Sequence, residues 1–285
     1  MTRVPRQSSV AVNGVEIALW EWPGAGRPVL FCHAAGFHGR IWDHVIARLP
    51  DDLHCYAYDA RGHGRSSKPL PPYAWRDFGV DAAAIAQSLG LSAALGVGHS
   101  VGGYAVTLAA ALRPRAFGGL LLIDPVILQR DQYTGPRNKA GFVAKRRSRW
   151  PSPENMFESF VGRSPFDAWD RDALRDYCQY ALIPDGQDYI LACPPAVEAA
   201  IYEASPEVRA NIYPEIAMID IPVHVVRAGR YRDPANVMGT SPTAPDLAAH
   251  FAKGRDTCLP EHSHFIPMEA PDLTAKLIIE ALALL

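Results

Sequence analysis

The feature of this sequence that most restricts its fold is an alternation of short apolar runs with helix-like segments through its first half. Apolar runs short enough for buried strands lie at residues 29–32, 53–58, 94–97 and 119–123. Segments with helical spacing lie between them, at residues 41–49, 78–89 and 101–112. This β-α-β-α rhythm is typical of a doubly wound, mostly parallel sheet. The predicted fold class is therefore α/β.

The alternation stops in the middle of the chain. Pro and Arg are frequent in residues 127–216, and the segments there look helical or irregular. Loops this long are rarely structureless in a compact domain, so we expect an inserted helical cap here. The core domain would then comprise residues 1–126 and 217–285, with further strands at 222–226 and 256–259 and a last helix at 273–284. At its start, Asn13-Gly14 predicts a hairpin turn.

Residues 98–102, Gly-His-Ser-Val-Gly, match G-x-S-x-G between a predicted strand and a predicted helix. A serine nucleophile in this motif sits on a sharp turn, where strand and helix backbones pass so closely that Gly98 and Gly102 are needed. Its hydroxyl then lies at the start of a helix, where backbone N–H groups favour developing negative charge. Glycine-rich turns also occur in other α/β proteins, so the partners of Ser100 decide whether it is a nucleophile.

A serine hydroxyl needs a base to take its proton, and histidine suits neutral pH. The last candidates are His262 and His264, which follow a predicted strand and precede the last helix. Here the chain resembles the α/β-hydrolase fold family, in which the catalytic His is followed by Phe, then Glu, then Pro. Phe265, Glu269 and Pro271 fit that pattern around His264. The resemblance implies that His264 is the base and that His262 is a surface loop residue.

The third member of the triad should be a carboxylate that fixes the histidine tautomer, and two residues are candidates. In the family it commonly follows the strand after the cap, and the next aspartate there is Asp233. The spacing is imperfect, because Gly229 lies four residues before it and the family usually has three. Some branches of the family carry the acid one strand earlier, where this chain has Asp124. We favour Asp124 and keep Asp233 as the alternative acid.

The same resemblance extends to the predicted oxyanion hole. Residues 33–37, His-Ala-Ala-Gly-Phe, resemble the family's H-G-x-x loop, with Ala34 in place of the usual glycine. This likeness implies that the backbone N–H groups of Ala35 and Val101 hold the oxyanion. Two such preorganised donors contribute several kcal/mol to a tetrahedral transition state.

A further motif resembles one of the family and is not expected to take part in the reaction. Residues 59–66, Asp-Ala-Arg-Gly-His-Gly-Arg-Ser, resemble its D-x-R-G-x-G-x-S loop. We interpret Asp59, Arg61 and His63 as scaffold residues that hold adjacent loops in place.

Composition argues against several classes of function. The formal net charge of -2 argues against nucleic-acid partners. The sequence has neither a signal-peptide core nor a run approaching the ~18 apolar residues of a membrane helix, so we expect a cytoplasmic protein without a membrane partner. Its 5 cysteines are spread without a C-x-x-C pair, which argues against a disulfide framework or a zinc site. We expect no metal and no cofactor.

Two groups of side chains in the expected cap each allow two interpretations. A basic group either attracts an anionic substrate or forms a solvated face, which we favour. It comprises Arg130, Arg137, Lys139, Lys145, Arg146, Arg147 and Arg149. An aromatic group either lines an apolar acyl pocket or forms the cap's own core. It comprises Trp150, Phe157, Phe160, Phe166, Trp169, Tyr177 and Tyr180.

Together these residues predict a serine hydrolase that cleaves a small or medium carboxylic ester or lactone by Ser-His-Asp acyl transfer to water. Its partner would be that small molecule, and its state a monomer or homodimer. Serine at the elbow argues against enzymes with an aspartate nucleophile. Three alternatives stay open: a carbon–carbon bond hydrolase on a vinylogous diketone, a cofactor-free peroxidase-like enzyme, and a non-catalytic small-molecule receptor. The fold does not decide among them.

Overall fold

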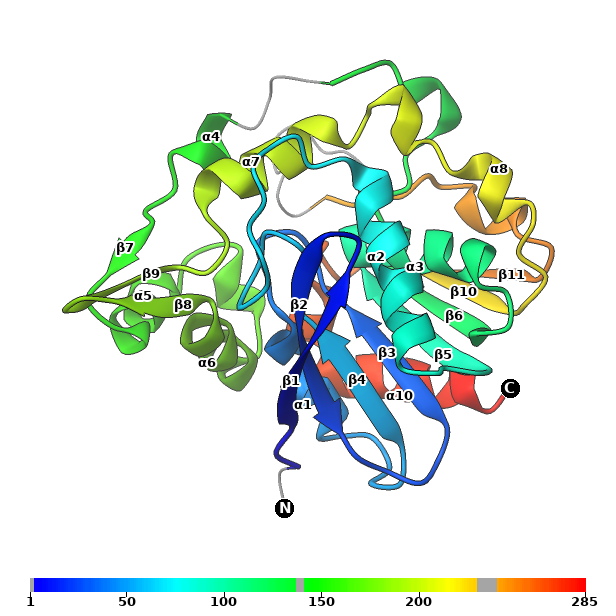
Figure 1. The fold of residues 1–285 in the computed structure, drawn as a ribbon, viewed down its shortest axis with the longest axis horizontal. Coiled ribbons are helices and arrows are strands. Elements are labelled where there is room, and N and C mark those ends of the chain that lie inside the picture. Colours follow the sequence, from blue (N-terminus) through cyan, green and yellow to red (C-terminus); the bar gives the residue numbers. More distant parts are fainter. Residues whose placement is uncertain (1–2, 137–140, 230–239) are drawn as a thin grey trace.

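The structure is a computed structural model and describes residues 3–136, 141–229 and 240–285. Its centre is an eight-stranded sheet with the order β1-β2-β4-β3-β5-β6-β10-β11 (Figure 1). In this sheet the six strands β4, β3, β5, β6, β10 and β11 pair in parallel with their neighbours in that order. Strand β2 pairs antiparallel with both β1 and β4. The predicted α/β class with a mostly parallel sheet is thereby confirmed. The strands are β1 Arg6–Val12, β2 Val15–Trp22, β3 Pro28–Cys32, β4 His54–Tyr58, β5 Ala94–His99, β6 Phe117–Ile123, β10 Val223–Ala228 and β11 Gly254–Leu259.

The predicted hairpin joins β1 to β2. Asn13 has φ 47° and Gly14 has φ 77°, so both turn residues take the left-handed conformation that a tight hairpin turn requires. Glycine and asparagine adopt this conformation more readily than other residues do. The pairing continues from Val12 opposite Val15 to Arg6 opposite Glu21.

Helices cover both faces of the sheet, which explains why its central strands are continuous apolar runs. Along β3, Leu30 belongs to the hydrophobic cluster under α2 and α3, and Phe31 to the cluster that includes α10. The core helices are α1 Asp43–Ile46, α2 Trp75–Ser88, α3 Val101–Leu112, α9 Ile266–Glu269 and α10 Pro271–Leu282. Two short 3₁₀ helices accompany them, η1 Gly39–Trp42 and η5 Leu247–His250.

The single helix predicted at residues 41–49 is wrong in its extent. The chain forms η1 and then only one turn of α-helix, α1. The last two bonds tighten to the 3₁₀ pattern, with Arg48 N–H donating to Val45 and Leu49 N–H to Ile46, both at 3.1 Å. The helical spacing of apolar residues is real because Ile41, Trp42 and Val45 are all buried, but the chain turns away towards β4 at residue 50.

The described parts of the segment, residues 127–136 and 141–216, lie beyond the carboxyl ends of the parallel strands (Figure 1). We expected a helical cap here, but the segment also holds a three-stranded antiparallel sheet with the order β7-β9-β8. Its strands are β7 Arg149–Trp150, β8 Leu182–Asp185 and β9 Asp188–Leu191, too short for a two-residue period to be visible in the sequence. The helices are α4 Gly141–Ala144, α5 Pro153–Phe160, α6 Arg171–Tyr180, α7 Pro195–Ala204 and α8 Tyr213–Ile216, with 3₁₀ helices η2 Arg130–Gln132, η3 Phe166–Ala168 and η4 Val208–Ala210.

Side-chain caps begin two of these helices. The Ser152 hydroxyl accepts from Asn155 N–H at 3.0 Å at the start of α5, and the Asp170 carboxylate accepts from Ala173 N–H at 3.0 Å at the start of α6. Such caps satisfy N–H groups that have no partner within the helix. Within the described ranges, no helix combines the length and apolar character that a membrane span needs.

Candidate active site

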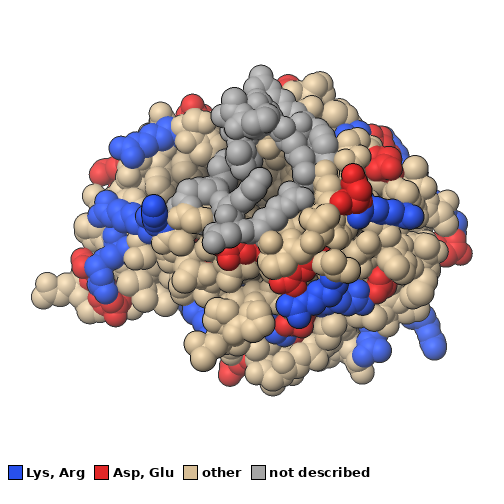
Figure 2. Space-filling model, turned by 90° about the horizontal axis from the view of Figure 1, so that it is seen from above, with Lys and Arg blue, Asp and Glu red and all other residues tan. Residues whose placement is uncertain are grey.

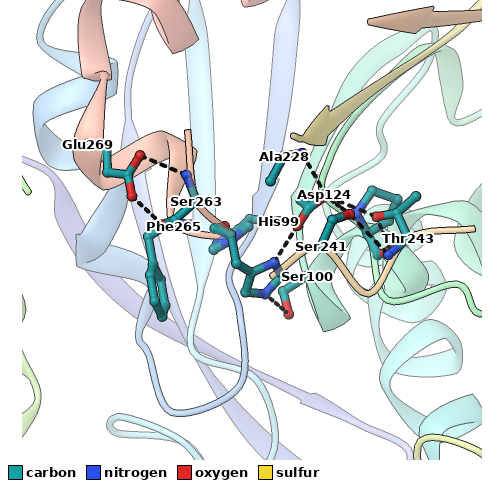
Figure 3. Close-up of polar contacts among 11 residues, drawn as sticks. His99, Ser100, Asp124, Ala228, Ser241, Thr243, Ser263, Phe265 and Glu269 are labelled. Atoms are coloured by element: carbon teal, nitrogen blue, oxygen red, sulfur yellow. Dashed lines mark hydrogen bonds and ion pairs between the residues drawn. The ribbon is translucent and has the colours of Figure 1, made fainter. Parts of the chain in front are cut away.

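Ser100 lies between the end of β5 and the start of α3, as the motif predicts (Figure 3). Its backbone has φ 58° and ψ -122°, a strained conformation for a residue with a side chain. The two glycines of the motif explain how the turn closes. A Cβ on Gly98 would lie 2.4 Å from the carbonyl oxygen of Gly102, and a Cβ on Gly102 would lie 2.2 Å from that of Cys32. The predicted close approach of the backbones is therefore present.

His264 follows β11 and places its imidazole against Ser100. Its Nε2 lies 3.1 Å from Ser100 Oγ, and its Nδ1 lies 2.6 Å from Asp124 Oδ2. Since the buried carboxylate accepts, Nδ1 carries the proton, and Nε2 is left to accept the serine hydroxyl proton. The side chain of His264 is 14% exposed and that of Asp124 is fully buried, so the pair is largely shielded from water.

Asp124 comes directly after β6, at the carboxyl edge of the sheet beside β5. Its backbone takes φ 42°, and its N–H donates to the Val226 carbonyl at 2.7 Å. The carboxylate oxygen not used by His264 accepts from Ala228 N–H at 3.0 Å and from the Ser241 hydroxyl at 2.5 Å. The structure therefore brings Asp124 together with Ser100 and His264. The alternative acid, Asp233, lies outside the described residues.

The loop that carries His264 is fixed from two sides. His99 occupies the variable position of the elbow motif, and its Nε2 lies 2.8 Å from the His264 carbonyl oxygen. Burial lowers the pKa of His99 well below its ordinary value, so the ring is neutral and its Nε2–H donates. On the other side Glu269 accepts from Ser263 N–H at 3.1 Å and lies 3.1 Å from His262 Nδ1. The Glu of the family pattern thus braces the histidine loop.

Sequence reasoning missed His99 and Ser241 as parts of this site. His99 occupies a variable motif position, and Ser241 is far from every motif in the sequence. Their place in the site can be recognised only in the folded structure, where the ends of β5, β6 and β10 lie side by side at one edge of the sheet. His262 was expected on the surface, but its side chain is only 18% exposed and pairs with Glu269.

The expected oxyanion loop follows β3, next to β5 in the sheet, so Ala35 and Val101 lie on neighbouring connections. Two buried histidines hold this loop. His33 Nε2 accepts from Ala60 N–H at 2.9 Å, and His63 Nε2 accepts from Gly36 N–H at 3.0 Å. Burial lowers the pKa of His33 to about 4 and that of His63 to about 3, so both rings are neutral acceptors.

The run of residues 59–66 has the scaffold contacts that we expected. The buried carboxylate of Asp59 accepts from Gly39 N–H at 2.7 Å and from Arg65 N–H at 2.8 Å. Arg61 forms a two-pronged pair with Asp81, at 2.6 and 2.7 Å. These contacts tie the loop after β4 to η1 and α2.

An aromatic cluster joins the insertion to the base loop. Phe37 packs on Trp169 with ring centroids 5.8 Å apart and on Tyr177 at 5.2 Å, and Trp169 packs on Phe265 at 5.2 Å. Phe37 is the last residue of the expected oxyanion loop, and Phe265 directly follows the base His264. The aromatic group of the insertion is therefore packed against the site residues as well as within itself.

The basic group of the insertion is largely engaged by neighbouring side chains. Arg146 pairs with the buried Glu198 and donates to the Tyr177 hydroxyl at 3.1 Å. Arg149 pairs with Asp185 and Asp188, and Arg147 lies 4.0 Å over the Trp150 ring. Arg137 and Lys139 lie outside the described residues. Figure 2 shows Lys and Arg side chains interspersed with Asp and Glu side chains around the visible face.

The fold is that of an α/β protein, and Ser100, His264 and Asp124 lie within hydrogen-bond reach of one another at the carboxyl edge of its sheet. The comparison with known families agrees: the chain belongs to the alpha/beta hydrolase family, whose model matches residues 29–277. The predicted family is thereby confirmed.

Curated relatives and solved structures carry names from this class. The chain is 26% identical over 264 residues to a 2-(acetamidomethylene)succinate hydrolase of Mesorhizobium japonicum, covering 90% of this chain and 87% of the relative. It is 29% identical over 213 residues to an esterase of Mycobacterium tuberculosis, covering 64% and 68%. A crystal structure of E-2-(acetamidomethylene)succinate hydrolase superposes with a TM-score of 0.78 at 22% identity, covering 98% of this chain and 99% of that one.

Proposed function

We propose that this protein is a serine hydrolase that cleaves a small or medium carboxylic ester or lactone, with Ser100 as nucleophile, His264 as base and Asp124 as acid. The observation that carries the proposal is the continuous chain of contacts from Ser100 Oγ to His264 Nε2, at 3.1 Å, and from His264 Nδ1 to Asp124 Oδ2, at 2.6 Å. Nucleophile, base and orienting carboxylate in hydrogen-bond reach are the signature of nucleophilic catalysis.

The reaction would proceed in two acyl transfers. His264 Nε2 takes the hydroxyl proton of Ser100 while Oγ attacks the carbonyl carbon, and the oxyanion is held by the N–H groups of Ala35 and Val101. His264 then gives its proton to the leaving alcohol as the C–O bond breaks. Water, deprotonated by the same Nε2, attacks the acyl-enzyme, and the acid leaves as Ser100 regains its proton. Asp124 stabilises the imidazolium at both steps.

The surroundings favour an uncharged acyl group. Phe37 in the expected oxyanion loop and Phe265 beside the base both pack against Trp169 of the insertion. Arg146, which donates to the hydroxyl of Tyr177 in this cluster, is already paired with the buried Glu198. A substrate carboxylate could pair with Arg146 only by competing with Glu198. An aliphatic acyl chain carries no charge and needs no such partner.

A second candidate is hydrolysis of an activated amide that carries carboxylates. It is favoured by the relative that spans 90% of this chain, because that protein is named for an acetamido-substituted succinate. The same nucleophile and oxyanion donors serve amides, so the bond and the charge of the substrate must be settled by assay.

The test is a panel of p-nitrophenyl esters with the wild type and Ser100→Ala. Butyrate and hemisuccinate esters form a matched pair, since they have four-carbon acyl chains and differ by a terminal carboxylate. We expect butyrate to be preferred, and Ser100→Ala to lose on the order of 10⁶-fold in kcat while keeping its circular dichroism spectrum. A preference for hemisuccinate, with turnover of an enamide of succinate, would favour the second candidate.

Other outcomes separate the remaining alternatives. Turnover that survives in Ser100→Ala would refute the proposed nucleophile. Turnover of a vinylogous diketone, but of no ester, would indicate a carbon–carbon hydrolase. Halide oxidation that requires both peroxide and a carboxylic acid would indicate peroxidase-like chemistry. Ligand binding without turnover of any substrate would indicate a receptor.

A further inference from the structure

The chain after β10 places a buried hydroxyl against the carboxylate of Asp124. Ser241 is 1% exposed, and its Oγ lies 2.5 Å from Asp124 Oδ1 (Figure 3). This is the region where the sequence led us to expect the alternative acid. Its described part supplies a hydrogen-bond donor to Asp124.

The neighbouring contacts determine where the Ser241 proton points. Thr243 N–H donates to Ser241 Oγ at 3.3 Å, so that oxygen already serves as an acceptor. The Thr243 hydroxyl lies 2.7 Å from the Pro125 carbonyl and 3.2 Å from Asp124 Oδ1, and the shorter distance favours the carbonyl for its single proton. The Ser241 proton is thus directed to the carboxylate, and Thr243 holds the segment against the residue after Asp124.

This bond fixes which way the carboxylate faces. Oδ1 accepts from Ser241 and from Ala228 N–H, which leaves Oδ2 aimed at His264 Nδ1. A hydrogen bond to a charged acceptor in a buried site is stronger than one between neutral groups. Without Ser241, the carboxylate would lose a donor on Oδ1 and be freer to rotate away from the imidazole.

We propose that Ser241 is a positioning residue, which holds Asp124 in the orientation that activates His264 and Ser100. The proposal rests on the proposed function, because it assigns Ser241 a role in that triad. Ser241 touches neither the substrate nor the reacting atoms, so its removal should slow acyl transfer without changing substrate affinity.

The experiment measures phosphonylation of Ser100 by a fluorophosphonate, followed by intact mass, because this step reports nucleophile activation without knowledge of the substrate. We expect Ser241→Ala to react about 10-fold to 100-fold more slowly than wild type, as for a lost hydrogen bond to a charged group. In the Asp124→Asn background, the same change should cost less than about 3-fold, because the carboxylate it positions is gone.

Two further variants separate positioning from a structural role. Thr107→Val removes a buried hydroxyl that donates to the Gly103 carbonyl at 2.7 Å, and it should lower thermal stability but leave the phosphonylation rate unchanged. Ser241→Cys nearly keeps the volume of serine with a weaker donor, and should fall between wild type and Ser241→Ala. It also replaces the alanine variant if that one does not fold.

The outcomes distinguish the two proposals. Wild type that is not labelled at Ser100 would refute the proposed function. Labelling of wild type at Ser100, with folded Ser241→Ala and Ser241→Cys equally fast, would refute the role of Ser241 alone. An equal loss from Ser241→Ala with and without Asp124 would also overturn it, because the effect would not pass through the carboxylate.

Discussion

Asp124 shows how a single buried carboxylate can be kept both charged and oriented. Taking such a group out of water costs several kcal/mol unless hydrogen bonds replace its hydration shell. The carboxylate is fully buried, and its donors come from Ala228, Ser241 and His264, on three separate segments of the chain. Since only Oδ2 faces the imidazole, this arrangement selects the tautomer in which Nε2 can act as a base.

The two aspartates considered from the sequence should therefore differ sharply when each is replaced. Asp124→Asn is expected to lower kcat on the order of 10⁴-fold, since an amide favours the wrong histidine tautomer. Asp233→Asn should leave kcat near the wild-type value. Steady-state hydrolysis of the preferred ester measures both. Mild and equal effects would contradict the triad, and a large loss confined to Asp233→Asn would move the acid to that position.

The loops beside the nucleophile depend on histidines that stay neutral. His33 and His63 each present a bare Nε2 to a backbone N–H group, and each ring bridges the loop after β3 and the loop after β4. Protonation would turn an acceptor into a donor facing another donor. The segment that carries the expected oxyanion donor Ala35 is thus held by contacts that acid can break.

Stability should accordingly fall on acidification. Burial places the pKa of His33 at about 4 and that of His63 at about 3, below the value of 6.5 expected when unfolded. Between these values the unfolded chain binds more protons, so the free energy of unfolding decreases as pH falls from about 6.5 to about 4. The slope is at most about 1.4 kcal/mol per pH unit for each histidine. At pH values more than about one unit above 6.5, neither the folded nor the unfolded chain binds these protons, so the two rings contribute almost no pH dependence.

Urea unfolding at pH 7, 6 and 5 measures that slope, and His63→Gln provides the comparison. Glutamine offers a neutral oxygen acceptor that does not titrate, so the variant should be less stable at pH 7 but lose less stability on acidification. Equal slopes in the two proteins would show that His63 does not take up a proton on unfolding.

Predictability from the sequence differed between elements for physical reasons. The sequence predicts strands β3, β5 and β6 because a strand that is buried on both faces is a continuous apolar run. It predicts helix α3 because a long helix repeats its apolar spacing over several turns. The strands β7, β8 and β9 were missed because two to four residues cannot show a period. Ser100 and His264 stood out because local motifs surround them. The choice between Asp124 and Asp233 stayed open because an acid that follows a strand has no local signature.

The insertion and the sheet are joined by buried apolar clusters. Trp150 and Trp169 lie in the same cluster as Trp42 and Phe265, and Ile201 lies in the cluster of α2 and α3. The Trp75 indole also donates to the Ile201 carbonyl at 2.7 Å across this boundary. The division into a core of residues 1–126 and 217–285 and a cap of residues 127–216 stays a prediction. The two segments pack against each other in these clusters. Unfolding of either one would therefore expose apolar surface of the other.

We therefore expect the insertion to unfold together with the sheet. In urea, wild-type tryptophan fluorescence reports the whole set of 6 tryptophans, whereas a Trp150→Phe/Trp169→Phe variant reports only those that precede the insertion. For each protein, the fluorescence midpoint should coincide with the midpoint from far-ultraviolet circular dichroism and with the loss of ester hydrolysis. A fluorescence change at lower urea in the wild type, but not in the double variant, would show that the insertion opens first. Coincident transitions would mean that the insertion, the sheet and the base loop unfold in one step. The apolar cluster that contains Phe265 would then couple the stability of the site to that of the whole fold.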